Sequence, residues 1–474
     1  MNPTPTIRID PITINGLYGG TADTHGSVTS LDALPKNMVM RWVGEGSLTW
    51  QVETVAAGEY QVALCYASLT EGARFEVLSG DSKLAGEVRT TRGIYEDQSL
   101  AEKSPSEMGY LRNYERAHLD GALRLPTGSS KITLRLVEPG SVEVIDLRSL
   151  ELVPLAAKEE IAAEARRARQ QRASTDWLVE AGYGLMFHWT DESQPRHGPK
   201  KAYADAVRDF DVSAFAEMVE ETGAGHVLFT LNHGNPHCPA PIAAWEALHP
   251  GWTTERDLIA EMAEALGGRG IRLMLYIASH ILMDRRFDEK PEGAREESVD
   301  FQRAHLDVLT EIGLRYGSNL AGYWFDGWDH ISPRYPNMRW PYQQLFEVAK
   351  AGNPDRIMSL NFWFFPDETP WQEYWAGEID APLREPLPGR YIEHPAGEGL
   401  QLQALIMLED IWEHGEPDSE VPQPTLSEEQ LIQYVKKVME KQGVVTINLG
   451  IYQDGTIGDE SRKRMSALRQ AIRG

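Results

Sequence analysis

A carboxylate ends a run of strand-forming aromatic residues in AGYWFDGWDH, residues 321–330. Tyr323, Trp324 and Phe325 favour a buried β-strand, whereas an aspartate such as Asp326 is rarely buried unless it is paired or functional. The glycine that follows leaves room beside the carboxylate for a ligand. We therefore interpret Asp326 as a functional residue that a rigid aromatic strand holds in place.

A second carboxylate, Glu378 in WAGEID, follows a later predicted strand. A pair of carboxylates on facing strands is the equipment of glycoside hydrolysis. One of them attacks or stabilises the oxocarbenium-like centre, and the other protonates the leaving oxygen. The pair therefore predicts a glycosidase. Neighbouring glutamates compete with Glu378 for the acid role: Glu368, Glu373, Glu385 and Glu393.

Aromatic and polar side chains near the predicted strand ends fit a sugar pocket, in which rings lie against apolar C–H faces and polar groups bind hydroxyls. Each residue alone is more often structural, because strand-end His and Asn commonly form turns and strand aromatics commonly lie in the core. Their combination at one rim favours a binding site. The residues concerned are His188, Trp189, Asn232, His233, Tyr276, Trp324, Trp328, Asn361 and Trp363.

The elements that position these residues are predicted from residue 177 to 474, where apolar strands alternate with amphipathic helices. Eight strands predict an α/β fold of the TIM-like (β/α)8 class, whose usual size is about 250 residues. In such a barrel the C-terminal ends of the strands carry the active site. The predicted strands begin at residues 183, 226, 272, 320, 357, 373, 402 and 444.

The region before the barrel has a different pattern. Residues 1–155 contain short segments of alternating polarity separated by turn signals such as AAGE and LPTGSS. This pattern predicts an all-β, jelly-roll-like sandwich domain. Residues 156–176 are rich in alanine and charge and predict a solvated linking helix. The catalytic barrel is then expected over residues 177–474.

Composition excludes several classes of protein. The 474 residues include 46 Lys+Arg and 71 Asp+Glu, a formal charge of -25, which argues against nucleic-acid binding. Cys65 and Cys238 lie far apart in sequence, so no disulfide framework is predicted and a reducing compartment is allowed. No basic start leads into an apolar segment, and no run of about 18 apolar residues occurs. We expect no membrane association and a cytoplasmic protein, or a secreted one if a leader was removed.

A metal site and a cofactor are not predicted. HGNPHC offers His233, His237 and Cys238 as ligand types, but no matching cluster elsewhere completes a zinc site. The sequence also lacks a glycine-rich phosphate loop and a nucleotide fingerprint in a strand-turn-helix setting. The expected partner is an oligosaccharide or glycoside, and oligomerisation is left open.

The chain from residue 183 to its C-terminus resembles the retaining α-L-fucosidases of glycoside hydrolase family 29. The resemblance is carried, in the family's order, by YGLMFHW, GAGHVLFTLNHGN, RLMLYIAS, GYWFDG and KQGVVTINLGIYQDGTIGDES. It implies that Asp326 is the nucleophile, two residues after the family's tryptophan at Trp324, and that Glu378 is the general acid/base. It also implies that His188 and His233 are the histidines that follow the first and second strands.

The sequence departs from that family where sugar hydroxyls are held. Gly234 and Asn235 in LNHGN stand where the family usually has a second histidine and an aspartate. Trp363 lies near the place of an arginine after the fifth strand, and His237 is available as a substitute donor. The family's accessory sandwich usually follows the barrel, whereas here a carbohydrate-binding-module-like sandwich is expected before it.

The expected function is therefore that of an exo-acting retaining glycoside hydrolase that removes terminal α-L-fucose or a closely related sugar by double displacement. Two alternatives stay open. The altered histidine motif favours a glycosidase for another fucose-like sugar, such as L-galactose or an arabinopyranose. A non-catalytic carbohydrate-binding protein on a decayed barrel is disfavoured, because a binder has no need of both Asp326 and Glu378.

Overall fold

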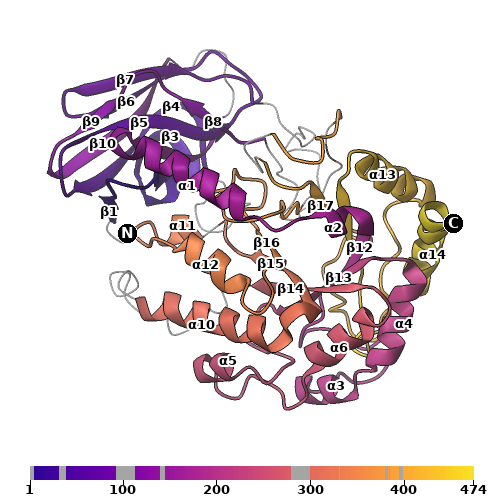
Figure 1. Cartoon of the computed structure of the whole chain (residues 1–474). Helices are drawn as coiled ribbons and strands as arrows, with labels where there is room; N and C mark the ends of the chain where they lie inside the picture. Colours follow the sequence, from indigo (N-terminus) through magenta and orange to yellow (C-terminus); the bar gives the residue numbers. More distant parts are fainter. Residues whose placement is uncertain are drawn as a thin grey trace.

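The computed structural model describes residues 5–30, 39–91, 113–138, 145–278, 299–329, 331–378, 383, 385–393 and 399–474. They form a mixed α/β structure with two curled sheets, one at the N-terminal end of the chain and one surrounded by helices (Figure 1). Within these ranges no helix is long and apolar enough to cross a membrane.

The N-terminal sheet is organised around β4 (Met40–Thr54), which pairs with several strands along its length. It pairs antiparallel with β3 (Asp23–Ser30), β10 (Gly128–Glu138) and β11 (Ile145–Pro154), and parallel with β1 (Thr6–Ile9). Alternate residues of these strands are buried in one hydrophobic core. The other strands are β2 (Asn15–Tyr18), β5 (Gly58–Ala67), β6 (Arg74–Ser79), β7 (Ser82–Glu87), β8 (Glu115–His118) and β9 (Leu123–Leu125), and the 3-10 helix η1 (Gly19–Thr21) follows β2.

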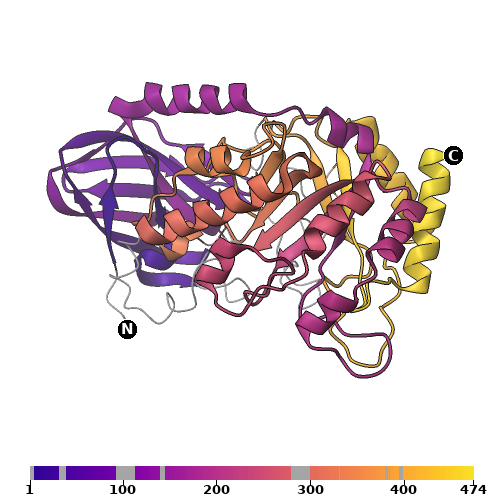
Figure 2. The same cartoon turned by 60° about the horizontal axis from the view of Figure 1, so that its bottom comes forward.

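A polar helix, α1 (Lys158–Gln171), connects the two sheets and lies along the outside of the molecule (Figure 2). The short 3-10 helix η4 (Leu155–Ala157) precedes it, and α2 (Asp176–Ala181) follows it. Only Ala168 of α1 is buried, as its alanine-rich and charged sequence predicts. The helix is nevertheless attached, because the indole of Trp371 donates to Glu164 over 2.9 Å.

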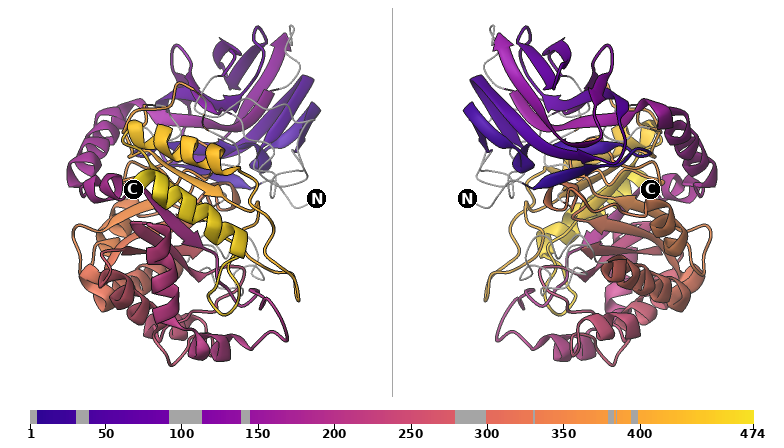
Figure 3. Two further views of the ribbon diagram at one scale, coloured as in Figure 1. Left: turned by 90° about the vertical axis from the view of Figure 1, so that its right-hand side faces the viewer. Right: turned by 90° about the vertical axis from the view of Figure 1, so that its left-hand side faces the viewer.

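The second sheet contains seven parallel strands in the order β16-β15-β14-β13-β12-β18-β17. Neighbours in this order are mostly neighbours in sequence, as expected for repeated strand–helix units. Figure 3 shows this sheet and its helices packed against the N-terminal sheet. The strands are β12 (Tyr183–Phe187), β13 (His226–Asn232), β14 (Arg272–Ala278), β15 (Leu320–Asp326), β16 (Ile357–Leu360), β17 (Gln403–Met407) and β18 (Val444–Asn448).

Helices cover the outer face of the parallel sheet (Figure 1). Local signals fix several of their ends: the Asp211 side chain caps α4 at the nitrogen of Ala214, and Gly223 ends that helix in the left-handed conformation at φ 74°. The helices that follow α2 are α3 (Tyr203–Asp209), α4 (Val212–Thr222), α5 (Ala243–Leu248), α6 (Leu258–Gly267), α10 (Val299–Tyr316), α11 (Ile331–Arg334), α12 (Tyr342–Ala349), α13 (Glu428–Glu440) and α14 (Asp459–Arg473), with the 3-10 helix η5 (Gly317–Asn319) before β15.

The predicted strand at 373–379 is not a regular strand over its described residues. Residues 373–378 instead form single bridges, from Tyr374 to Gln401 just before β17 and from Glu378 to Leu405 of β17. On the other side, the backbone nitrogen of Glu373 donates to the Met358 carbonyl of β16 over 3.0 Å. The segment therefore lies between the two edge strands of the seven-stranded sheet.

Candidate active site

The two faces of β14 and β15 separate core residues from site residues. Odd-numbered residues such as Leu275 and Phe325 pack toward the helices, whereas Tyr276 and Trp324 belong to a cluster on the inner face. Strand register pairs Tyr276 with Trp324 and Ala278 with Asp326. Because side chains alternate with a period of two, Asp326 projects from the same face as Trp324, at the C-terminal end of its strand.

Asp326 accepts two hydrogen bonds, one from a residue of β14 and one from the residue that follows β16. The Tyr276 hydroxyl donates to Oδ2 over 2.5 Å, and Asn361 Nδ2 donates to Oδ1 over 2.8 Å. Burial, together with the negative charge of Asp326, raises the pKa of Tyr276 well above its ordinary value. The phenol therefore keeps its proton and acts as a hydrogen-bond donor to the carboxylate.

Asn361 brings the two predicted catalytic carboxylates together. Its Nδ2 donates both to Asp326 and to Oε2 of Glu378. The orientation of the amide is fixed, because the Trp363 backbone nitrogen donates to Oδ1 over 2.9 Å. The Asn361 nitrogen also donates to the Phe325 carbonyl over 2.7 Å, which attaches the residue to β15. One side chain thus sets the separation of both acids.

The glutamates that compete with Glu378 lie in other environments. Glu373 is buried and accepts from Lys350 Nζ over 2.6 Å and from the Met358 nitrogen over 2.9 Å. Glu368 accepts from the Tyr18 hydroxyl of the N-terminal sheet over 2.8 Å. Glu385 is exposed and pairs with a lysine, and Glu393 is exposed. Of the described candidates, Glu378 is the one that shares a hydrogen-bond donor with Asp326.

Histidine rings continue the wall of the site. The His188 ring lies 4.4 Å from His233 and 5.0 Å from Tyr276 between centroids. Burial, and then the neighbouring His233, lower the pKa of His188 well below its ordinary value, so its imidazole is neutral. Neither ring nitrogen of His188 has a hydrogen-bond partner among the described residues. A neutral imidazole there can donate from one nitrogen and accept at the other.

The segment after β17 supplies site residues that the sequence did not single out. The Trp412 ring lies 5.9 Å from His188. Glu413 accepts from the Thr190 hydroxyl over 2.6 Å, and burial raises its pKa. A signal existed in WEHGE, where an aromatic and acidic residues follow a predicted strand, as they do after β15.

The other predicted site residues are divided between this group and the core. Trp324 belongs to the group: its ring stacks on Tyr276 at 5.2 Å, and its indole donates to the Ala376 carbonyl over 2.9 Å. Asn232 is buried and exchanges hydrogen bonds with the Ala278 backbone, which joins β13 to β14. Trp363 contributes its backbone nitrogen to Asn361 and packs its ring on Phe364.

Three predicted residues have their described contacts outside the group around Asp326. The Trp189 ring packs on Phe210, and its indole donates to the Gln453 carbonyl over 3.1 Å. Trp328 packs on Trp340 with 4.9 Å between centroids. The His237 ring stacks on Tyr203 at 4.5 Å, and burial lowers its pKa. These contacts are typical of core and surface packing.

The altered LNHGN motif forms a tight turn. Gly234 has φ 70°, which favours glycine, and a Cβ added there would meet nothing within 4 Å. The Asn235 side chain donates to Asp191 and accepts from the His237 backbone nitrogen. Both polar atoms of the Asn235 amide therefore form hydrogen bonds that stabilise the turn.

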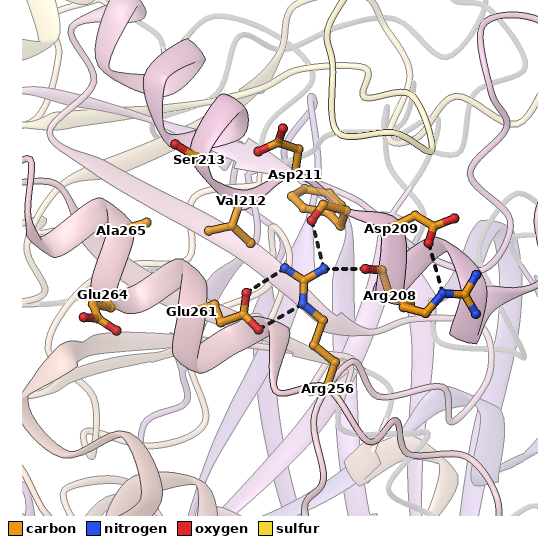
Figure 4. A pocket seen from close by; sticks show the side chains of 10 residues that line it. Arg208, Asp209, Asp211, Val212, Ser213, Arg256, Glu261, Glu264 and Ala265 are labelled. Atoms are coloured by element: carbon orange, nitrogen blue, oxygen red, sulfur yellow. Dashed lines mark hydrogen bonds and ion pairs between the residues drawn. The ribbon is translucent and has the colours of Figure 1, made fainter.

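Two described cavities lie away from Asp326. One, of about 700 Å³, opens beside Arg256, whose guanidinium is paired with Glu261 and backbone carbonyls (Figure 4). The other, of about 520 Å³, lies between the N-terminal sheet, α1 and α12. In the described part of the chain, no group of three or more His, Cys, Asp or Glu side chains could hold a metal ion.

Glu409, which follows β17, is a buried carboxyl group with a shifted pKa. It accepts from the Gly450 nitrogen over 3.0 Å and from the Ser461 hydroxyl, and burial raises its pKa to about 7. The unfolded value is about 4.3, so the folded state holds this proton more tightly. The resulting stabilisation is complete below about pH 4.3 and is lost as the pH rises through about 7.

Glu409→Gln is expected to gain thermal stability relative to wild type as the pH rises, because glutamine fills the site without a charge. Thermal unfolding at pH 5 and pH 8 measures the difference. Glu440→Gln, at an exposed position of α13, is the control. A difference in Tm between Glu409→Gln and wild type that does not change with pH would contradict the prediction.

Residues 151–471 match the model of a family described as alpha-L-fucosidase. Similar solved structures include α-L-fucosidase isoenzyme 1 from Paenibacillus thiaminolyticus, with 18% identity over 65% of this chain and 76% of that chain and a TM-score of 0.47. An α-L-fucosidase from Lactobacillus casei with α-L-fucose bound has 16% identity, 63% and 98% coverage and a TM-score of 0.44. No curated protein matches.

Proposed function

The chain belongs to the alpha-L-fucosidase family and is a glycoside hydrolase that removes α-L-fucose, and we propose that Asp326 is its nucleophile and Glu378 its general acid/base. The observation that carries this assignment is the amide of Asn361, which donates to both carboxylates. The described rivals of Glu378 lie elsewhere: Glu373 and Glu385 pair with lysines, Glu368 accepts from Tyr18, and Glu393 is exposed.

The shared donor supports a retaining mechanism. Two oxygens that each lie within about 3.2 Å of one nitrogen are at most about 6.4 Å apart. Retaining glycosidases place their carboxyl groups about 5 to 5.5 Å apart, whereas inverting enzymes need about 6.5 to 9.5 Å to admit a water. The bridge through Asn361 leaves too little room for that water, which agrees with the retention that is general in this family.

The reaction then takes two displacements. An Asp326 oxygen forms a bond to the anomeric carbon while the glycosidic bond breaks and Glu378 gives its proton to the leaving oxygen. Glu378, now a carboxylate, takes a proton from water, whose oxygen attacks the anomeric carbon and releases Asp326. Before the attack, Tyr276 and Asn361 hold the free carboxylate of Asp326 by charge-assisted hydrogen bonds, so it is aligned before the substrate binds.

We propose that the sugar lies against Trp324 and Tyr276 with its hydroxyls facing His188 and His233. The buried ring nitrogens of His188 support this placement, because they have no partner among the described residues. Glu413, which burial biases toward its neutral form, is a further hydroxyl partner. Trp189, Trp328 and His237 have no part in this proposed binding mode, because their described contacts lie outside the group around Asp326.

The finer architecture is also a proposal. We propose that residues 373–379 are the sixth strand of a closed (β/α)8 barrel over residues 177–474, since their described part bridges β16 and β17. Residues 1–155 would then form a jelly-roll-like, carbohydrate-binding-module-like sandwich, joined by the helical linker at 156–176. We infer an oligosaccharide or glycoside as the substrate and a cytoplasmic location, or a secreted one.

The function is tested by the hydrolysis of p-nitrophenyl glycosides followed by proton NMR. We expect turnover of the α-L-fucoside in preference to the α-L-galactoside, α-L-arabinopyranoside and β-D-galactoside, with the α-anomer of the free sugar appearing first. First formation of the β-anomer would exclude the retaining mechanism. Turnover of another glycoside alone would show that the enzyme acts on a different sugar by the same kind of hydrolysis. No turnover of any glycoside would contradict the proposed function.

A further inference from the structure

A buried arginine of the N-terminal sheet reaches into the loop that follows the nucleophile strand. Arg148 of β11 is 2% exposed. Its Nη2 donates to the backbone carbonyl of Asp329, three residues after Asp326, and lies 3.7 Å from Oε1 of Glu368. The contact is not visible in the sequence, because donor and acceptor are 181 positions apart.

Aromatic rings fix the plane of this guanidinium. The Arg148 Cζ lies 4.1 Å from the centre of the Phe365 ring and 5.0 Å from the centre of the Tyr18 ring. Such contacts are attractive and become stronger when the cation is desolvated. Phe365 also packs edge-on against Tyr114 of the N-terminal region at 4.9 Å.

Glu368 extends the contact to both loops beside the catalytic residues. Its Oε2 accepts from the Ser332 hydroxyl over 2.5 Å, and its Oε1 accepts from the Tyr18 hydroxyl over 2.8 Å. Ser332 belongs to the short helix α11 in the connection after β15, the strand that carries Asp326. Phe365 and Glu368 belong to the loop after β16, which begins with Asn361. Arg148 therefore joins these two loops to each other and to the sheet.

The loop after β16 contains a backbone conformation that needs such support. Trp363 has φ 57°, in the left-handed region that side chains other than glycine rarely adopt. Such a residue persists only where its surroundings hold it. Its nitrogen orients the amide of Asn361, which donates to both carboxylates. A shift of this loop would therefore move the donor that aligns Asp326 with Glu378.

We propose that Arg148 is a positioning residue for the glycosidase reaction, so that the N-terminal sheet is part of the catalytic machinery. This inference rests on the proposed function. Arg148 acts through Asp329, Phe365 and Glu368, and does not itself contact the sugar. A displacement of about 1 Å at reacting groups can cost about 100-fold in rate, so the expected effect is on kcat.

The test compares Arg148→Ala, Arg148→Lys and wild type on the α-L-fucoside, at a temperature where circular dichroism shows each variant folded. We expect Arg148→Ala to lower kcat by about 10- to 100-fold, with KM changed by less than about threefold. Added guanidinium chloride, at concentrations that do not unfold the protein, is expected to restore part of kcat. Arg148→Lys should lie between the two, because an ammonium keeps the charge but lacks the planar donor.

Leu134→Ala is the matched control. Leu134 is buried in the core of the same sheet, so its truncation lowers stability without reaching either loop. It should lower Tm, retain the kcat of wild type and show no response to guanidinium. Should Arg148→Ala not fold, Arg148→Lys carries the same comparison.

The outcomes separate this inference from the proposed function. A folded Arg148→Ala or Arg148→Lys with the kcat of wild type would overturn the positioning role but not the proposed function. Arg148 would then only stabilise the contact between the N-terminal sheet and the two loops. An equal loss of kcat in Leu134→Ala would also overturn it. A wild type that turns over no glycoside would contradict the proposed function, and the inference with it.

Discussion

Asp326→Ala is expected to lower kcat for p-nitrophenyl α-L-fucoside by more than about 1,000-fold, because the variant cannot form the covalent intermediate. The fold should persist, since the lost contacts are two hydrogen bonds at the end of β15. Steady-state kinetics and thermal unfolding of the purified variant measure both properties. Asp355→Ala, at an exposed position before β16, is the matched control and should retain full activity.

Rescue by azide distinguishes the loss of the nucleophile from a loss of activity caused by a disturbed structure. In Asp326→Ala, azide enters the space of the missing carboxylate and forms its bond to the anomeric carbon as nitrophenolate leaves from the opposite face. The product should be the β-fucosyl azide, with inverted configuration, and its formation should raise the rate. Activity within tenfold of wild type, or an α-azide, would exclude Asp326 as the nucleophile.

Glu378→Gln has the second largest expected effect, and its size depends on the leaving group. For a fucosylated sugar, whose leaving oxygen needs a proton, kcat/KM should fall by about 100- to 10,000-fold. For p-nitrophenyl fucoside the first step needs little protonation, so kcat/KM should fall much less while the covalent intermediate accumulates. Kinetics on a fucosyl disaccharide and on the nitrophenyl substrate measure this difference.

Azide again gives a product that identifies the role. It attacks the covalent intermediate of Glu378→Gln from the face that the leaving group vacated, so the product should be the α-fucosyl azide. Glu385→Gln is the matched control, because Glu385 is an exposed glutamate nearby in sequence that pairs with Lys437. Equal losses on both substrates, with no response to azide, would return the acid role to another residue.

Much of the parallel sheet could be predicted from apolar runs. The strand predicted from residue 226 coincides with β13, because a buried parallel strand is apolar throughout. The run from residue 373 reads as a strand but contains Gly377, which has φ 61° and lies so close to Gln403 that a Cβ there would meet its carbonyl at 2.1 Å. A left-handed residue interrupts the extended repeat, and only single bridges remain.

A glycine also accounts for a difference between the sequence pattern and the structure in the N-terminal region. In the sequence, MVMRWV at 38–43 and SLTWQVETV at 47–55 are separated by GEG and indicate two short segments, whereas the structure has the single strand β4, Met40–Thr54. Gly46 allows the close approach of another strand, since a Cβ there would lie 2.7 Å from the His25 carbonyl. The same residue type marks turns and close backbone contacts, and sequence alone does not separate them.

The candidate site could be predicted where alternation along a strand determines which way a side chain points. It could not be predicted where loops far apart in sequence come together. Alternation along β15 and β14 places Asp326 and Tyr276 on the same face of the sheet. Trp189 lies beyond the end of β12, where alternation no longer predicts the direction of a side chain. Arg148 is separated from Asp326 by many residues and carries no local motif, and the sequence signal for Glu413 is only its place in WEHGE after a predicted strand. Their positions depend on how the N-terminal sheet and the segment after β17 pack, which periodicity does not encode.

The N-terminal region and the parallel sheet share part of one hydrophobic core. Val39, Cys65, Ala67 and Tyr114 of the N-terminal region belong to the same continuous hydrophobic cluster as the helix-facing side of the parallel sheet. Where cores merge, neither part can open without exposing apolar surface of the other. Heating should therefore produce a single transition, and a chain cut before α2 would lose a wall of its own core rather than a detachable module.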